Sequence, residues 1–105
     1  MKPLRSPDRK PTHPGAVLRE DVLPALKMTQ AEFAEQLGVS RLTVSELLLE
    51  KRALTPEMAV RLATVLSTSP ESWLRMQATL DLWLLKQTPE RFSALKPLDR
   101  KLLEA

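Results

Sequence analysis

The residues best able to do chemistry lie in one short segment, Ser40 to Glu46 (SRLTVSE). In a helix that begins at Arg41, the outward-facing residues are Arg41, Leu42, Thr43, Ser45 and Glu46. Arginine can donate two hydrogen bonds to a guanine edge, leucine can contact a thymine methyl group, threonine can serve a base or a phosphate, and glutamate can accept from cytosine. The set indicates recognition of duplex DNA, for which Arg41 is the strongest candidate.

Residues on either side of this segment offer phosphate contacts. Thr29 can cap a helix that starts at Gln30, whose side chain and first N–H groups can hold a phosphate. Lys51 and Arg52 follow the end of the second helix, where they can contact the DNA backbone. Thr29 is a structural cap in either case, and exposed cations are often only solvated, so both alternatives remain open.

The sequence offers no catalytic constellation. It has one histidine, no cysteine and two glycines, which leaves no ordinary zinc site, no disulfide and no glycine-rich pocket with paired acids. His13 has no second titratable residue nearby, so we expect it to begin the first helix rather than act as a ligand or base. We predict that the protein is not an enzyme and has no cofactor or metal.

The spacing across residues 30–48 (QAEFAEQLGVSRLTVSELL) fits a helix-turn-helix. The residues expected to face inward are Phe33, Ala34, Leu37, Val44, Leu47 and Leu48. Gly38 can adopt the positive φ that ends the first helix, and Ser40 can cap the second by accepting from an N–H near Thr43. A helical hairpin that serves only as scaffold would show the same packing.

The charge pattern weakens the case for a simple basic binding surface. The net charge is +3, and residues 1–13 alone carry a balance of +3. Residues 29–52 hold three basic and four acidic side chains. DNA affinity would therefore come from a few placed cations, helix N-termini, a basic arm and two copies acting together.

Composition predicts an all-α fold. Only 4% of the 105 residues are aromatic, and no long β-branched alternation is present. We expect a mobile basic arm at 1–13, a helix-turn-helix domain at 14–87 and a C-terminal helical extension at 88–105. The arm either binds DNA or a partner or is a solvated tail. Without a long apolar run or a signal-like N-terminus, we expect a soluble cytoplasmic protein.

Local signals mark the other helices. The first starts at Pro14, with Pro24 ending or kinking it and a charged face at residues 19–21 that is most simply solvated. Three triplets, Thr55-Pro56-Glu57, Ser69-Pro70-Glu71 and Thr88-Pro89-Glu90, each place a hydroxyl cap before proline and a carboxylate, and so predict three helix starts.

The helix from about residue 70 to 87 carries two apolar stripes. One consists of Trp73, Met76, Leu80, Trp83 and Leu84, and the other of Leu74, Ala78, Leu82 and Leu85. A helix that is apolar on most of its circumference must be covered on most of it. We predict a symmetric homodimer through Trp73, Leu74, Ala78, Leu82, Trp83 and Leu85, with two half-sites about one DNA turn apart. Alternatively, the last segment folds back over this helix.

Three segments resemble a known family: HPGAVLREDVLPAL, TQAEFAEQLGVSRLTVSELL and LTPEMAVRLATVLSTSPESWLRMQATLDLW. In this order they resemble the HigA-type antitoxins, also called virulence-associated protein I, within the XRE/Cro-repressor helix-turn-helix class. The resemblance implies a lambda-repressor-like fold of five to six helices with a long C-terminal dimerisation helix. It implies DNA contacts at Gln30, Ser40, Arg41, Thr43 and Ser45.

The resemblance also implies partners. They are palindromic operator DNA, a second copy of the chain, and a RelE/HigB-like mRNA-cleaving toxin whose operon the antitoxin represses. Two alternatives stay open, which are a transcriptional repressor of the same class without a toxin and an interaction adaptor that does not bind DNA.

The sequence departs from the family at two places. Leu49-Glu50 stand where Asn-Gly is usual, which alters the end of the recognition helix and places a negative charge beside the expected phosphates. Lys27 stands where glycine is usual, so we expect a left-handed backbone there.

Overall fold

The computed structural model describes residues 9–104, and its regular elements within that range are all helical. In chain order they are α1 (Pro14–Val17), η1 (Leu18–Val22), α2 (Leu23–Leu26), α3 (Gln30–Leu37), α4 (Arg41–Leu48), α5 (Pro56–Leu66), α6 (Pro70–Lys86), η2 (Pro89–Phe92) and α7 (Arg100–Leu103). The predicted all-α class is confirmed. No helix in the described range is long and apolar enough to cross a membrane.

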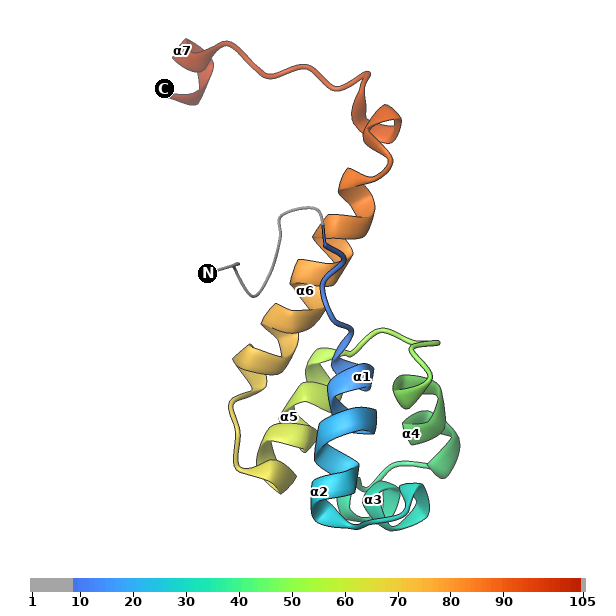
Figure 1. The fold of residues 1–105 in the computed structure, drawn as a ribbon. Helices are drawn as coiled ribbons and strands as arrows, with labels where there is room; N and C mark the ends of the chain where they lie inside the picture. The colour runs from blue at the N-terminus through green and yellow to red at the C-terminus, as the bar shows by residue number, and fades with distance from the viewer. Residues whose placement is uncertain (1–8, 105) are drawn as a thin grey trace, which may run out of the picture.

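The first three elements form one rod across the body (Figure 1). Its middle part, η1, is a π-helical turn, and the N–H of Leu23 bonds to the carbonyl of Leu18. The wider turn accommodates Pro24, which has no N–H and whose ring would clash with a carbonyl in a regular α-helix. Pro24 therefore does not end the helix, which runs to Leu26. It ends where Lys27 takes the expected left-handed backbone, with a φ of 56°.

Helices α3 and α4 form the predicted helix-turn-helix. The six residues expected to face inward are all buried: Phe33, Ala34, Leu37, Val44, Leu47 and Leu48. Gly38 closes α3 with a φ of 70°, and the N–H of Val39 bonds to the carbonyl of Ala34 at 3.0 Å. Ser40 caps α4 by accepting from the N–H of Thr43 at 3.1 Å. These local predictions are confirmed, since Gly38 and Val39 bond to carbonyls at the end of α3 and Ser40 bonds to an N–H at the start of α4.

Gly15 brings the first rod and the second helix of the motif into backbone contact. A Cβ added at Gly15 would lie 1.9 Å from the carbonyl oxygen of Leu47. Only a residue without a side chain fits there. This close packing fixes α4 against α1 and positions the residues at the start of α4.

Helices α5 and α6 close the body, and their starts are capped as predicted. Thr55 and Ser69 accept hydrogen bonds from the N–H groups of Met58 and Ser72. The third triplet behaves differently. Thr88 starts only the short 3-10 helix η2 without a side-chain cap, because its hydroxyl donates instead to the carbonyl of Leu85 at the end of α6.

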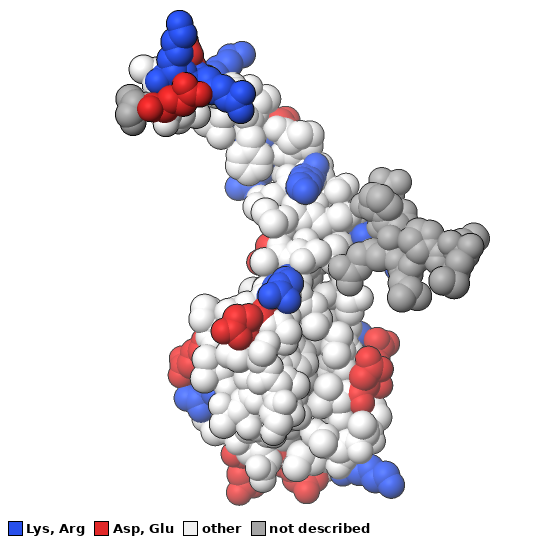
Figure 2. All heavy atoms as spheres, turned by 90° about the vertical axis from the view of Figure 1, so that its left-hand side faces the viewer, with Lys and Arg blue, Asp and Glu red and all other residues white. Residues whose placement is uncertain are grey.

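Helix α6 projects beyond the body, and the chain after it leads farther away (Figure 1). Trp73 and Leu80 are buried in the first part of α6, whereas Leu82 is 57% exposed. The end of α6 and the chain after it, residues 81–104, form a projecting column. Figure 2 shows a largely uncharged surface along this column, with charged side chains gathered at its far end. The apolar residues of the tail, Leu95, Leu98, Leu102 and Leu103, are 65–73% exposed. The alternative that the last segment folds back over α6 is therefore wrong for the single chain.

Most of the predicted arm, residues 1–8, lies outside the described residues. Its described end runs beside α6, with Pro11 and His13 buried. His13 caps α1 by accepting the N–H of Gly15 on Nδ1 at 2.8 Å. The prediction that His13 begins the first helix is confirmed.

Candidate nucleic-acid interface

The start of α4 presents an exposed cation. Arg41 is exposed, and its guanidinium makes no hydrogen bond or ion pair with another residue in the range 9–104. Leu42 beside it is 67% exposed. A free guanidinium next to an exposed apolar side chain is the combination that can bond to a guanine edge and contact a thymine methyl group.

The hydroxyl groups at the start of α4 are linked to each other. The Oγ atom of Ser40 lies 2.9 Å from Oγ1 of Thr43, so one of them donates to the other. Because the Ser40 oxygen also accepts from the backbone, the pair holds the first turn of α4 in place. Ser45 is half-buried one turn further on.

Two of the predicted contact residues neutralise each other. The Arg52 guanidinium donates to Oε1 of Glu46 at 3.0 Å, and both side chains are partly exposed. An ion pair of this kind contributes about 0–1 kcal/mol, so a phosphate can displace the carboxylate. Lys51 is exposed and has no such partner among the described residues.

The start of α3 is closed by a reciprocal cap. The Thr29 hydroxyl accepts from the N–H of Glu32, while the Glu32 carboxylate accepts from the N–H of Thr29 at 3.0 Å. The backbone hydrogen bond to Thr29, followed by its hydroxyl, lowers the pKa of Glu32. The Thr29 N–H is therefore occupied, and the first N–H of α3 that remains for a phosphate belongs to Gln30.

Two arginines missed by the sequence analysis cap the C-terminal ends of the motif's helices. Arg61 on α5 donates to the carbonyl of Leu37 at 2.8 Å. Arg19 on η1 donates to the carbonyl of Leu48 at 2.6 Å and to Glu50 at 3.2 Å. A cation at a helix C-terminus bonds to carbonyls that lack a partner within the helix. Arg19 is thus not simply solvated, and its guanidinium also lies 3.9 Å from the exposed carboxylate of Glu20.

Leu49 and Glu50, which stand where the family usually has Asn-Gly, still form a regular helix end. Glu50 adopts a φ of 62°, the left-handed conformation that glycine ordinarily supplies. The N–H of Glu50 bonds to the Leu47 carbonyl, and the N–H of Lys51 bonds to the Glu46 carbonyl, which is the usual closing pattern of a helix. The altered pair therefore still ends α4 sharply, and the negative charge of Glu50 is directed to Arg19.

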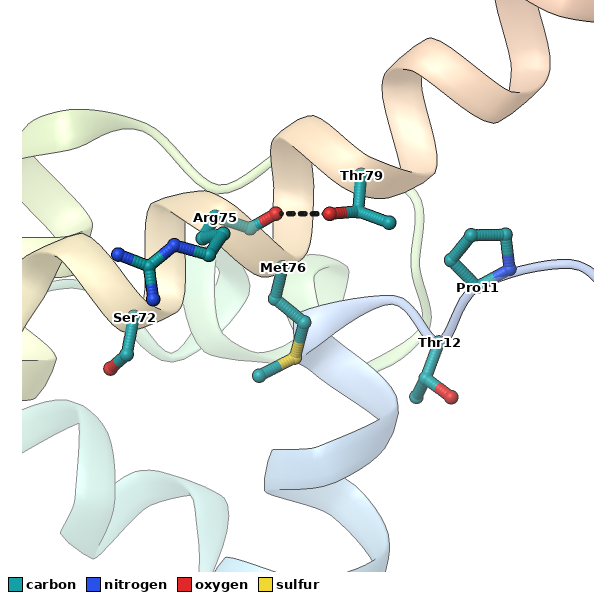
Figure 3. Close-up of a pocket in the computed structure, with 6 residues that line it drawn as sticks. All are labelled: Pro11, Thr12, Ser72, Arg75, Met76 and Thr79. Atoms are coloured by element: carbon teal, nitrogen blue, oxygen red, sulfur yellow. Dashed lines mark hydrogen bonds between the residues drawn. The ribbon is translucent and has the colours of Figure 1, made fainter. Parts of the chain in front are cut away.

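A hollow of about 220 Å³ lies where the N-terminal segment meets α6 (Figure 3). It is lined by Pro11, Thr12, Ser72, Arg75, Met76 and Thr79. The Thr79 hydroxyl donates to the carbonyl of Arg75 within the same helix. No group of three or more metal-binding side chains occurs here or elsewhere in the range 9–104.

Comparisons with known proteins give consistent results. The helix-turn-helix family model HTH_3 matches residues 18–73. The chain is 45% identical over 80 residues to the uncharacterized HTH-type transcriptional regulator YbaQ of Escherichia coli K12, covering 76% of this chain and 71% of that protein. It is 35% identical over 96 residues to antitoxin HigA-1 of Vibrio cholerae, covering 90% of each.

Among solved structures, antitoxin GraA in complex with its operator matches with a TM-score of 0.79 and 33% identity. The match covers 90% of this chain and 98% of that one. The residues of the candidate interface, 29–52, all lie within the part of the chain that the helix-turn-helix family model matches.

Proposed function

The chain belongs to the helix-turn-helix family and, within it, to the HigA-type antitoxins, and we propose that it binds the operator of its own operon with α4 as the recognition helix. Proteins of this kind act by binding and not by catalysis. The observation that carries the proposal is the free Arg41 guanidinium at the start of a helix whose two ends are held by side-chain hydrogen bonds. Support comes from GraA, which was solved on its operator.

The contact residues divide into two groups in this proposal. Those that meet bases are Arg41, Leu42, Thr43, Ser45 and Glu46, and those that meet phosphates are Thr29, Gln30, Ser40, Lys51 and Arg52. Arg52 would leave Glu46 for a phosphate on binding, which frees the Glu46 carboxylate to accept from a cytosine amino group.

The proposed assembly is a homodimer through α6. Ala78, Leu82 and Leu85 are exposed, and Leu74 and Trp83 are partly exposed, so these residues are available to a second copy. Trp73 is only 6% exposed and donates from Nε1 to the Thr68 hydroxyl at 2.8 Å. Its contribution to the interface would therefore be indirect, by fixing α6 on α5.

The DNA-binding proposal is tested with a duplex from the region upstream of the chain's own gene. Arg41→Ala should weaken binding by about 1–3 kcal/mol if the bidentate guanine contact exists. Lys96→Ala, which removes an exposed cation from the tail, is the matched control and should leave the affinity within about twofold. Equal affinities of the wild type and Arg41→Ala would support the alternative of an adaptor that does not bind DNA.

The toxin proposal needs a separate experiment. We propose that the partner is a RelE-like mRNA-cleaving toxin encoded beside this gene, on the support of the likeness to HigA-1. Co-expression of the neighbouring reading frame should yield a co-purifying complex and relieve growth arrest. A neighbour that neither arrests growth nor binds the chain would instead favour a stand-alone regulator, the alternative suggested by the likeness to YbaQ.

A further inference from the structure

We propose that Gln77 and His13 are positioning residues for DNA binding, which hold the second half of the segment 49–55 so that Arg52 meets its phosphate. This segment, called the exit loop below, links α4 to α5. The inference rests on the proposed function, and it concerns two buried polar side chains that the interface described above does not use.

The two halves of the exit loop are held in different ways. The first half is fixed by the end of α4, through the N–H groups of Leu49, Glu50 and Lys51. Residues 52–54 have no backbone–backbone hydrogen bond within the described part of the chain. Leu54 packs its own side chain into the core, and the backbone polar groups of Arg52 and Leu54 bond to side chains from other elements.

Gln77 on α6 supplies one of these side chains. Its Oε1 accepts from the N–H of Leu54 at 2.8 Å, and its Nε2 donates to Asp81 at 2.9 Å. Both ends of the amide are satisfied in this orientation, since Leu54 offers only a donor and the carboxylate only an acceptor. A buried amide that accepts at one end and donates at the other holds its neighbour in one position.

His13 supplies the other. Because its Nδ1 accepts from Gly15, its Nε2 carries the hydrogen and donates to the carbonyl of Arg52 at 3.1 Å. The histidine thus joins the start of α1 to the exit loop. The hollow between the N-terminal segment and α6 (Figure 3) is lined by Thr12 and Met76, which precede His13 and Gln77 in the chain.

This arrangement has a functional consequence. The same helix that carries the exposed apolar face also fixes the loop with the proposed phosphate contacts, and Gln77 is the link between them. Without it, Arg52 and its neighbours would sample several positions, and phosphate contacts made by the loop would be lost. The slope of log affinity against log salt concentration is negative, and each lost contact reduces its magnitude by about 0.9.

The experiment compares operator binding across a salt series. Gln77→Met keeps the length of the side chain but has no oxygen to accept from Leu54. We expect weaker binding, and a salt dependence whose slope is smaller in magnitude by about 1. Val65→Ala, a half-buried position on α5 remote from the loop, is the control for lost stability, and its slope should equal that of the wild type. Gln77→Glu combined with Asp81→Asn restores an acceptor for Leu54 and a donor between the two side chains, and should restore the slope.

Amide exchange gives a readout that does not depend on DNA. In Gln77→Met the Leu54 N–H should exchange at least about tenfold faster than in Val65→Ala. If Gln77→Met does not fold, His13→Asn serves instead, because asparagine keeps the cap on α1 but does not reach Arg52. A normal salt slope together with unchanged exchange at Leu54 in Gln77→Met would overturn the inference, and so would a normal salt slope in His13→Asn if that variant is the one used. Failure of the wild type to bind the duplex would instead contradict the proposed function.

Discussion

The body formed by residues 13–80 and the projecting column formed by residues 81–104 differ in how completely they bury their apolar side chains. In the body, the ends of α3 and α4 are satisfied by Arg61 and Arg19 from other helices. No buried side-chain nitrogen or oxygen in the described residues lacks a partner. In the column, leucines at 82, 84, 85, 95, 98, 102 and 103 are exposed. The column therefore exposes apolar surface that the described part of the chain leaves uncovered, which is the surface proposed to bind a second copy.

The dimensions reflect this difference. The radius of gyration is 17.8 Å, against about 13 Å for a compact domain of some 100 residues. The excess comes from the column, which extends away from the body in Figure 1. Substitutions in the body should therefore change the free energy of unfolding of one chain, and substitutions in the column should change association.

The largest expected effect is in the body, at Gly15→Ala. The new methyl group would meet the Leu47 carbonyl at 1.9 Å, so α1 and α4 must separate. We expect a loss of about 3 kcal/mol in the free energy of unfolding, the upper end for over-packing. Urea denaturation measures it, with Leu95→Ala in the tail as the control that should change stability by less than about 0.5 kcal/mol. A mild effect at Gly15 would mean that the two backbones can move apart freely.

The next effect is in the column, at Leu82→Asp. A leucine side chain that becomes fully buried contributes about 1.5–3 kcal/mol, so its replacement should raise the dimer dissociation constant at least about tenfold. Because Leu82 is 57% exposed in the single chain, the helix content should not change. Analytical sedimentation measures the dissociation constant, and circular dichroism measures the helix content.

The matched control is Val60→Asp, at an exposed apolar position on α5. It should leave the dissociation constant unchanged. If Val60→Asp and Leu82→Asp raised the dissociation constant equally, association would not depend on the column more than on the body.

A smaller effect, of opposite sign, is expected at Ser67→Gly. Ser67 ends α5 with a φ of 57°, where glycine avoids the steric cost of a side chain. We expect a gain of up to about 1 kcal/mol in the free energy of unfolding. Glu50→Gly, with a φ of 62° but an ion pair to Arg19, should gain less because the carboxylate contact is lost. A larger gain at Glu50 than at Ser67 would show that the ion pair contributes nothing.

The smallest effect concerns pH and Glu32. Its pKa is lower in the folded chain than the ordinary value of 4.5, because its carboxylate accepts from Thr29. The stabilisation is therefore present above pH 4.5 and lost as the pH falls through the lowered folded value. The difference in unfolding free energy between the wild type and Glu32→Gln should shrink over that window. A difference that is constant from neutral pH to pH 3 would contradict the reciprocal cap, where pH 3 is roughly one unit below a free glutamate's pKa.

The parts of the fold that could be predicted are those specified by neighbouring residues. The caps at Thr29, Ser40, Thr55 and Ser69 use an N–H three residues ahead, and the turn at Gly38 needs only its own backbone. The same local signal at Thr88 did not produce a capped α-helix. There the chain has left the body, and no core remains against which a helix could pack.

The contacts that escaped prediction join distant parts of the chain. Arg19 reaches a carbonyl 29 residues away, His13 one 39 residues away, and Gln77 an N–H 23 residues away. The neighbouring sequence does not indicate these contacts. Arg19 lies in a charged face, His13 at a helix start and Gln77 between apolar positions. The residues proposed to meet DNA could be selected by type and spacing, but the pairing of Glu46 with Arg52 required the structure.

The most direct test is the binding of the chain to its own upstream duplex, in which the two half-sites are first located by footprinting. Two chains that present their α4 helices from one face should bind each operator as a pair, with half-sites about one helical turn apart. Inserting about five base pairs turns one half-site to the opposite face, and the affinity should then fall at least tenfold, about 1.4 kcal/mol. Binding by a single chain, or an affinity that does not change with the insertion, would contradict the proposed dimer of recognition helices.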